Sequence, residues 1–395
     1  MNLFSYNNRA LIGLSFGHFS IEIYASLLVP LYPVIVKHLD INLAKISLII
    51  ALGHFLASML QPYFGFISDK LQHRIFMIWG LVVGAFFIPF SIKYNNVLFF
   101  TSCLLIGMIG NAFFHPQSST LMKEFNKNNP KIAMNMGIFL GLGTIGYALG
   151  PYISSFCVDK WGLNNLIYLS LVGIIYAIFM YIYVPKIPKR EIKNKGSFLN
   201  ILKEILKNKT CMILVYISTI KSLVSISFGT YIPFLLEQHG FNLNHIGLIV
   251  TLFFISGGIA SMTSARFEKY LTTKGVIATS MIGILPLTVL FLISLKFNKP
   301  LAIISLSLIG YCILMSVGII LVQAQKAMPK YTGVISGAIQ GVGWGLGALF
   351  LPFMGILGQN FGVDKILIIV AIIAFLMGIY CLKTKSLNFN LSDKS

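Results

Sequence analysis

The sequence predicts an all-α polytopic membrane protein with twelve transmembrane helices, arranged as two six-helix halves. Three observations lead to this fold class. The 395-residue chain is 56% hydrophobic and only 10% charged, with a mean hydropathy of +0.84, whereas a soluble domain carries about 25% charged residues. Long apolar runs alternate with short basic loops, and the second half of the chain repeats the first.

Twelve apolar runs are long enough to be spanning helices. Only helices and closed barrels satisfy the backbone in lipid, and these runs are much longer than barrel strands. The expected spans are residues 10–36, 43–68, 75–92, 97–122, 131–157, 164–184, 211–236, 243–265, 275–295, 300–325, 331–357 and 362–382. No A-x-A-like cleavage site follows the first run, so we expect a retained span rather than a signal peptide.

A basic polar stretch between the sixth and seventh spans divides the chain. We expect an N-terminal six-helix bundle at 1–184, a cytoplasmic linker with a surface helix at 185–210, and a C-terminal six-helix bundle at 211–395. Most Lys and Arg residues lie on the side of this linker, so the positive-inside rule predicts a cell-membrane protein with both termini cytoplasmic. The net charge of +19 therefore reflects membrane topology, and we expect no nucleic-acid partner.

The two halves align at a shift of 200 residues. This shift pairs Pro33 with Pro233 and Asn42 with Asn242, and it also pairs three glycines of the fifth span with three of the eleventh. Leu and Ile matches are frequent by chance in membrane helices, whereas Pro, Asn and Gly matches are rarer. Two parallel six-span halves are the architecture of the major facilitator fold.

The strongest functional candidate is an acidic residue inside the first span. Glu22 lies 13 residues after Arg9, about 20 Å along a helix, where an ionised carboxylate costs several kcal/mol on insertion scales. His18 precedes it by four residues and shares its helix face. A protonated glutamate that merely ties two helices together is the alternative. Because intramembrane ionisable residues are usually functional, we expect Glu22 to carry a proton.

A second histidine, His115 in the fourth span, lies about 12–13 Å from the cytoplasmic side, as His18 does. The two regions resemble the fosmidomycin-resistance family of major facilitator exporters, which carries G-H-F-x-x-[DE]-x-Y in the first span and F-H-P-[EQ]-x-S in the fourth. The matching residues are Gly17, His18, Phe19, Glu22, Tyr24, Phe114, His115, Pro116 and Ser118. Glu22 stands where an Asp is usual, and Gln117 where a Glu is usual.

This resemblance implies proton-coupled efflux of small, often anionic, compounds. We expect His18 and His115 to act with Glu22 in proton coupling. We also expect both histidines, together with Tyr24 and Gln117, to contact the substrate. The Glu-to-Gln departure at position 117 leaves the proton path and the substrate open.

The loop after the second span, from Gly65 to Arg74, resembles the superfamily's signature G-x-x-x-D-[RK]-x-G-[RK]-[RK]. Gly65, Asp69, Lys70 and Arg74 match it, and Gln72 replaces the second glycine. The resemblance implies that the loop gates the inward side through the Asp and a helix N-terminus. A basic loop with a purely topogenic role is the alternative.

In the fifth span, Gly146 to Pro151 resembles the G-x-x-x-G-P signature of drug:proton antiporters. Small residues let helices approach closely, and a proline kinks the helix. We expect Gly146, Gly150 and Pro151 to serve helix packing.

Away from the ends of the expected spans, Lys221 is the only Lys or Arg inside a span, as Glu22 is the only Asp or Glu. The 200-residue shift places both at matching depth, on facing helices, so we expect Lys221 to anchor an anionic group of the substrate. A neutral or snorkelling lysine is the alternative. His54 in the second span is a weaker candidate, since a lone histidine among apolar residues usually serves packing.

The expected function is secondary active transport, as a proton-coupled exporter of small anionic compounds or drugs that works as a monomer without a cofactor. Two other transport functions stay open, namely proton-coupled uptake of an organic anion and transport of a divalent metal or metal chelate through His18, Glu22, His54 and His115. No metal site is assigned, because no Cys joins this set and Lys221 would repel a cation. The sequence contains no nucleophile–base pair or nucleotide-binding loop that would indicate an enzyme.

Overall fold

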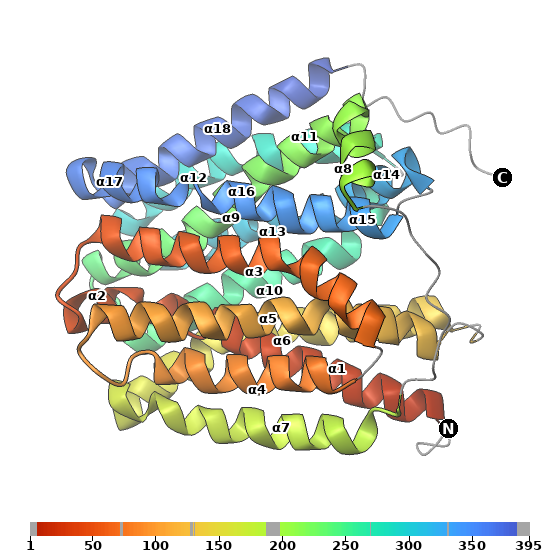
Figure 1. Ribbon diagram of the computed structural model, residues 1–395. Helices are drawn as coiled ribbons and strands as arrows, with labels where there is room; N and C mark the ends of the chain where they lie inside the picture. Colours follow the sequence, from red (N-terminus) through yellow and green to blue (C-terminus); the bar gives the residue numbers. More distant parts are fainter. Residues whose placement is uncertain are drawn as a thin grey trace. The chain divides into compact units, whose positions relative to one another are not determined.

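The structure, a computed structural model, describes residues 6–71, 74–126, 129, 131–186, 198–268, 270–329 and 332–384 (Figure 1). Within these residues every regular element is helical. Eleven helical segments of the described chain are long and apolar enough to cross a membrane. A further apolar helix, α4 (Ile75–Phe90), is shorter, with 16 residues. Together they confirm the predicted all-α polytopic fold.

The first half of the described chain contains seven α-helices. They are α1 (Tyr6–Ser26), α2 (Tyr32–His38), α3 (Leu43–Leu71), α4, α5 (Val97–Phe125), α6 (Ile132–Trp161) and α7 (Leu169–Tyr183), with 3-10 turns at Val29–Leu31 and Leu163–Tyr168. The side chain of Asn96 sets the start of α5, because its Oδ1 accepts a hydrogen bond from the N–H of Phe99 at 2.9 Å. Such a cap satisfies a backbone donor that the helix itself leaves unpaired.

The second half begins with α8 (Phe198–Lys207), an amphipathic helix within the expected linker. The helices that follow it along the chain are α9 (Lys209–Gln238), α10 (Leu243–Phe267), α11 (Thr273–Ile282), α12 (Ile284–Phe297), α13 (Lys299–Leu314), α14 (Val317–Ala327), α15 (Thr332–Gly337), α16 (Gly343–Ala348), α17 (Leu351–Phe361) and α18 (Val363–Lys383). A π-helical turn, Ala338–Val342, joins α15 to α16. The linker residues 187–197 lie outside the described residues.

The backbone repeats at the same shift as the sequence. Asp40 and Gly240 have positive φ angles of 49° and 76°, and Gly162 and Gly362 have positive φ angles of 83° and 100°. In each pair the residues are 200 positions apart and lie just before or after equivalent helices. Residues other than Gly rarely adopt a positive φ angle. The recurrence of this backbone conformation therefore confirms the internal repeat predicted from the sequence.

The helices form two compact units that exchange short segments. Unit 1 comprises Met1–Asn42, Leu52–Lys193 and Gly240–Thr251, and unit 2 comprises Leu43–Ala51, Asn194–His239 and Leu252–Ser395. Within unit 1, Asn244 Nδ2 donates a hydrogen bond to Asp159 Oδ2 at 2.7 Å. Within unit 2, the hydroxyls of Ser47 and Tyr231 lie 3.0 Å apart. The division at the 185–210 linker stays a prediction.

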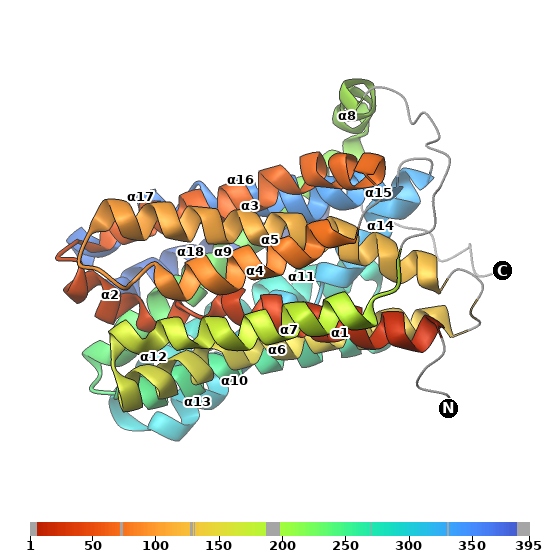
Figure 2. The same cartoon turned by 60° about the horizontal axis from the view of Figure 1, so that its bottom comes forward.

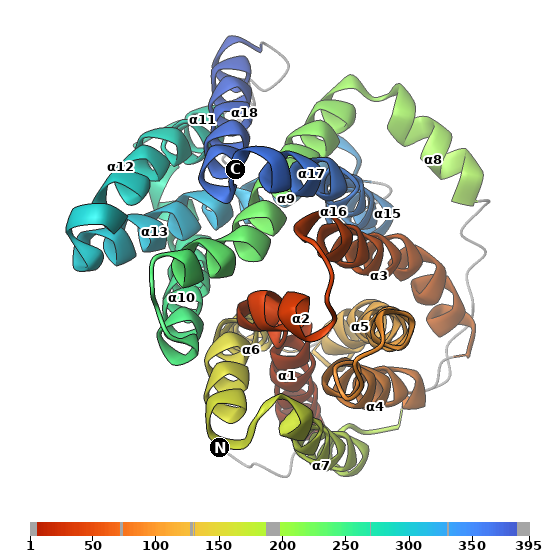
Figure 3. The same cartoon turned by 90° about the vertical axis from the view of Figure 1, so that its left-hand side faces the viewer.

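One helix forms the centre of each unit. In unit 1, α1 packs against α4, α5, α6 and α7, as the view along the helices shows (Figure 3). Helix α7 also packs beside α4 (Figure 2). In unit 2, α9 packs against α13, α14, α16 and α18. A polar side chain on α1 that points into unit 1 is therefore positioned to contact other helices of the unit.

Candidate functional site

The candidate site lies on α1 inside unit 1. His18 and Glu22 are one helical turn apart, and His18 Nε2 lies 3.3 Å from Glu22 Oε1. His18 is 6% exposed, and its ring stacks on that of Phe139 of α6, with 4.4 Å between centroids. Helix α6 approaches this closely because Gly143 lies against the imidazole, where a Cβ would collide with it.

A backbone carbonyl fixes the orientation of His18. Its Nδ1 lies 2.9 Å from the carbonyl oxygen of Phe139. Because a carbonyl oxygen only accepts, Nδ1 carries the hydrogen of this bond. The other ring nitrogen, Nε2, is thereby directed at the Glu22 carboxyl group.

The fourth span brings a second imidazole to the same carboxyl oxygen. His115 Nε2 of α5 lies 3.5 Å from Glu22 Oε1, and the rings of His115 and His18 meet edge to face with centroids 5.4 Å apart. The side chains of Glu22 and His115 are 17% and 23% exposed. We call these three residues the His18–Glu22–His115 cluster.

The cluster is arranged to hold a proton or another cation between its imidazoles and the carboxylate. If both imidazoles were neutral with Nε2 unprotonated, their lone pairs would face an acceptor-only carboxylate, and the contacts would be repulsive. A proton between an Nε2 atom and Oε1 turns the contact into a hydrogen bond. The ligand atoms of the three side chains also lie within 4.8 Å of one another, so a metal cation could occupy the same position.

Two residues expected to contact the substrate make hydrogen bonds to backbone groups of unit 1. Tyr24 is 2% exposed, and its hydroxyl donates to the carbonyl oxygen of Leu169 at 2.6 Å. Gln117 is also 2% exposed, and its Oε1 accepts from the N–H of Met77 at 2.7 Å. Met77 lies in the first turn of α4, so Gln117 caps that helix from α5. Their substrate-binding roles stay predictions.

Lys221 lies in unit 2 and points into that unit. It is 3% exposed, and its Nζ donates to Ser280 Oγ at 3.3 Å. Ser280 in turn shares a hydrogen bond of 2.8 Å with Ser316. Among the described residues, the ion pairs of Glu22 are with the two histidines. The expected position of Lys221 opposite Glu22 therefore stays untested, since the two residues belong to different units.

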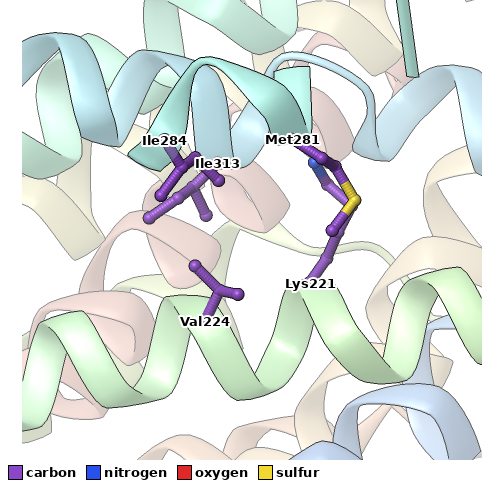
Figure 4. A pocket seen from close by; sticks show the side chains of 5 residues that line it. All are labelled: Lys221, Val224, Met281, Ile284 and Ile313. Atoms are coloured by element: carbon purple, nitrogen blue, oxygen red, sulfur yellow. The ribbon is translucent and has the colours of Figure 1, made fainter. Parts of the chain in front are cut away.

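A small space lies beside Lys221. Lys221 and Val224 extend from α9 toward Met281, Ile284 and Ile313 (Figure 4). The gap between these side chains has essentially no room even for a water molecule, whereas ligand pockets typically measure about 300–1,000 Å³. A substrate would fit beside this amine only if the surrounding helices moved apart.

The other sequence candidates occupy helix ends and helix contacts. Gly65, Asp69 and Lys70 lie in the last turns of α3, and the guanidinium of Arg74 lies 5.0 Å from the ring centre of Tyr181. The gating role of this loop stays a prediction. In α6, a Cβ at Gly146 would collide with the carbonyl of Phe19, and one at Gly150 with Ser26 Oγ. Pro151 continues the same helix.

Two residues of interest, Phe139 and Asn111, are not among the candidates predicted from the sequence. The Phe139 carbonyl could not be found from side-chain patterns, because any residue supplies a backbone oxygen. Asn111 could have been found, since it precedes His115 by four residues and so shares its face of α5. Its Oδ1 is buried and has no hydrogen-bond partner among the described residues.

A membrane-spanning chain with repeated halves and a charged cluster inside a span has the features of a membrane transporter. Residues 14–352 match the Major Facilitator Superfamily, and the chain belongs to this superfamily. It is therefore a multi-pass membrane transporter and not an enzyme, as the sequence predicted.

Similar proteins agree with this assignment. The fosmidomycin resistance protein of Escherichia coli (strain K12) is 23% identical over 376 residues, covering 92% of this chain and 89% of that protein. The quinolone resistance protein NorA of Staphylococcus aureus (strain MSSA476) is 23% identical over 359 residues, covering 89% and 88%. A solved nucleoside transporter, NupG, shares the fold with a TM-score of 0.79, 16% identity, and coverage of 94% of this chain and 99% of that chain. The resemblance identified from the motifs is thus confirmed.

Proposed function

We propose that this transporter exports small anionic compounds or drugs across the cell membrane in exchange for protons. The observation that carries the proposal is the Glu22 carboxyl group held between two imidazoles within a spanning helix. This cluster can gain and lose a proton without any side chain leaving the span. Two relatives are named for resistance, one to fosmidomycin and one to quinolones, which favours export as the direction of transport.

The charge of the cluster changes with each proton. With one shared proton, Glu22 and the two histidines are neutral together. A second proton makes the cluster positive, and loss of the first makes it negative. Coupling follows when the substrate binds one of these charge states better than the others. For antiport, bound substrate and the added proton must exclude each other.

Uptake of an anion together with a proton is the second candidate, and the electrostatics of the same cluster favours it. A doubly protonated cluster attracts an anion, so proton and anion would promote each other's binding. Antiport of an anion therefore requires that the substrate displace the proton by occupying the space between Glu22 and a histidine. The direction of the driving pH gradient separates the two candidates.

Lys221 enters the proposal as the anchor of the anionic group. Its buried amine has a hydroxyl partner, Ser280, and an anion would supply the countercharge that this hydroxyl lacks. The limited space beside Lys221 implies that unit 2 opens around α9 when substrate binds.

The test uses purified protein in liposomes with the membrane potential clamped, and fosmidomycin as the probe. Antiport predicts accumulation when the interior is the acidic side, and symport predicts it when the exterior is acidic. At one proton per substrate, a gradient of one pH unit drives about tenfold accumulation. If accumulation of the substrate is the same under both pH gradients, transport is not coupled to protons.

A matched pair of variants locates the coupling. Glu22→Gln keeps the size of the side chain but cannot change its charge, so we expect substrate binding without gradient-driven accumulation. Glu204→Gln makes the same chemical change on α8, outside the spans, and should accumulate substrate as the native protein does. If Glu22→Gln still concentrates substrate tenfold under the gradient, Glu22 is not the coupling residue.

A further inference from the structure

We propose that the His18–Glu22–His115 cluster is a binding site for a divalent transition-metal ion of the zinc, cobalt or nickel class. Two imidazole nitrogens and one carboxylate oxygen come together from α1 and α5, and all three ligand atoms lie within 4.8 Å of one another. Binding of the ion is a property of unit 1 alone. It requires neither a substrate nor a pH gradient, so it goes beyond the proposed function.

The spacing of the ligand atoms fits tetrahedral coordination. Zinc binds His nitrogen and carboxylate oxygen at about 2.0–2.2 Å, which places neighbouring ligand atoms of a tetrahedron about 3.3–3.5 Å apart. The observed separations from Glu22 Oε1 are 3.3 Å to His18 Nε2 and 3.5 Å to His115 Nε2. An ion therefore fits between these atoms with only small side-chain movements.

The orientation of His18 is also that of a metal ligand. Metal-binding histidines usually donate their second ring N–H to a carboxylate or a backbone carbonyl, which fixes the tautomer and leaves the other nitrogen free to coordinate. The Nδ1 of His18 makes this bond to the Phe139 carbonyl at 2.9 Å, and the ring is held by stacking on Phe139. The site is thus built around one pre-oriented nitrogen.

A candidate fourth ligand comes from α5, one helical turn before His115. Asn111 lies one turn before His115 on the same face of α5, and its buried Oδ1 has no hydrogen-bond partner among the described residues. An unpartnered buried oxygen is costly unless a donor or a cation approaches it. We expect this oxygen to complete the tetrahedron, so its removal should lower the affinity for the ion.

The ligand set also selects the class of ion. Two imidazoles with oxygen ligands suit Zn²⁺, Co²⁺ and Ni²⁺, whereas Mg²⁺ and Ca²⁺ prefer oxygen ligands alone. We therefore expect Zn²⁺ to bind in the presence of a large excess of Mg²⁺. A bound ion would occupy the position of the shared proton, so inhibition of transport by Zn²⁺ is a consequence that does rest on the proposed function.

The test measures binding of Zn²⁺ alone to the full chain, purified without a polyhistidine tag, at one fixed pH and without a gradient. Calorimetry should show one site per chain. His18→Gln and His115→Gln should each weaken it at least about tenfold, the loss typical when even an outer-shell partner of a metal site is removed. His54→Gln is the matched control, because it removes a histidine of α3 outside the cluster and should leave affinity unchanged.

Asn111→Leu distinguishes loss of a metal ligand from loss of protein stability. It removes the unpartnered oxygen, so the metal-free protein should melt no lower than the native protein while its Zn²⁺ affinity falls. Absence of a Zn²⁺ site in the native protein would overturn the proposal, as would equal binding by the native protein and both cluster variants. Coupling is measured in liposomes containing a chelator, so the metal site and the proposed function can each fail independently.

Discussion

Replacing Gly146 by Ala should destabilise unit 1, whereas the same change at Gly137 of the same helix should not. A Cβ at position 146 would collide with the carbonyl oxygen of Phe19 and would lie 3.0 Å from the Phe19 Cα. These are backbone atoms of α1 and cannot rotate away, so α1 and α6 must separate. A Cβ at position 137 would have no atom of the other described residues within 4 Å, the backbone of its own helix aside.

The two substitutions should change the free energy of unfolding in opposite directions. Forcing extra volume into a packed interface costs about 1–3 kcal/mol, whereas Gly to Ala at an open helical position stabilises by about 0.5–1 kcal/mol. The two variants should therefore differ by roughly 1.5–4 kcal/mol, the combined range of these two effects. Thermal unfolding of both proteins in the same detergent measures the difference in apparent stability. If Gly146→Ala melts at or above the temperature of Gly137→Ala, close approach of α1 and α6 is not what this glycine provides.

Three further predictions concern transport. Asp69→Asn should slow transport while substrate affinity stays within about twofold, because a gate affects the conformational step rather than binding; an unchanged rate would leave the loop only a topogenic role. His115→Gln should flatten the pH dependence of transport, because it removes one of the two imidazoles that share protons with Glu22; a pH–rate profile identical to the native one would assign His115 to packing. Lys221→Met should fold normally, because Ser280 keeps its bond to Ser316, but should lose binding of an anionic probe; retained binding would exclude the anchor role.

The fold could be predicted because its signals are compositional and periodic. Apolar runs of spanning length, basic loops and the 200-residue repeat each depend only on the chain itself. The cluster was predicted for a similar reason. His18 and Glu22 are one turn apart on any helix, and counting residues from the basic loops gave His115 the same depth as His18.

The sequence does not predict the direction in which a side chain points or the backbone group that it bonds. Tyr24 bonds to the carbonyl of Leu169, 145 residues away, and Gln117 bonds to the N–H of Met77, 40 residues away. Neither partner has a signal in the sequence, because each is a backbone group. For Lys221 the repeat predicted the depth of the residue in the membrane. The rotation of α9 about its own axis, which the repeat does not predict, decides which side chains the amine contacts.

The exchange of segments between the two units has a consequence for how such a chain can arise. Residues 43–51 belong to unit 2, and residues 240–251 belong to unit 1, so the exchange is reciprocal at equivalent positions of the repeat. Reciprocity of this kind is what two identical subunits related by a two-fold axis produce when each lends the same element to the other. A single ancestral half could therefore have formed both contacts as a homodimer, before duplication joined the copies. In the present chain each compact unit contains residues from both halves of the sequence. In unit 2, for example, Ser47 of the first half is hydrogen-bonded to Tyr231 of the second. The halves should consequently remain bound to each other when the peptide chain between them is cut.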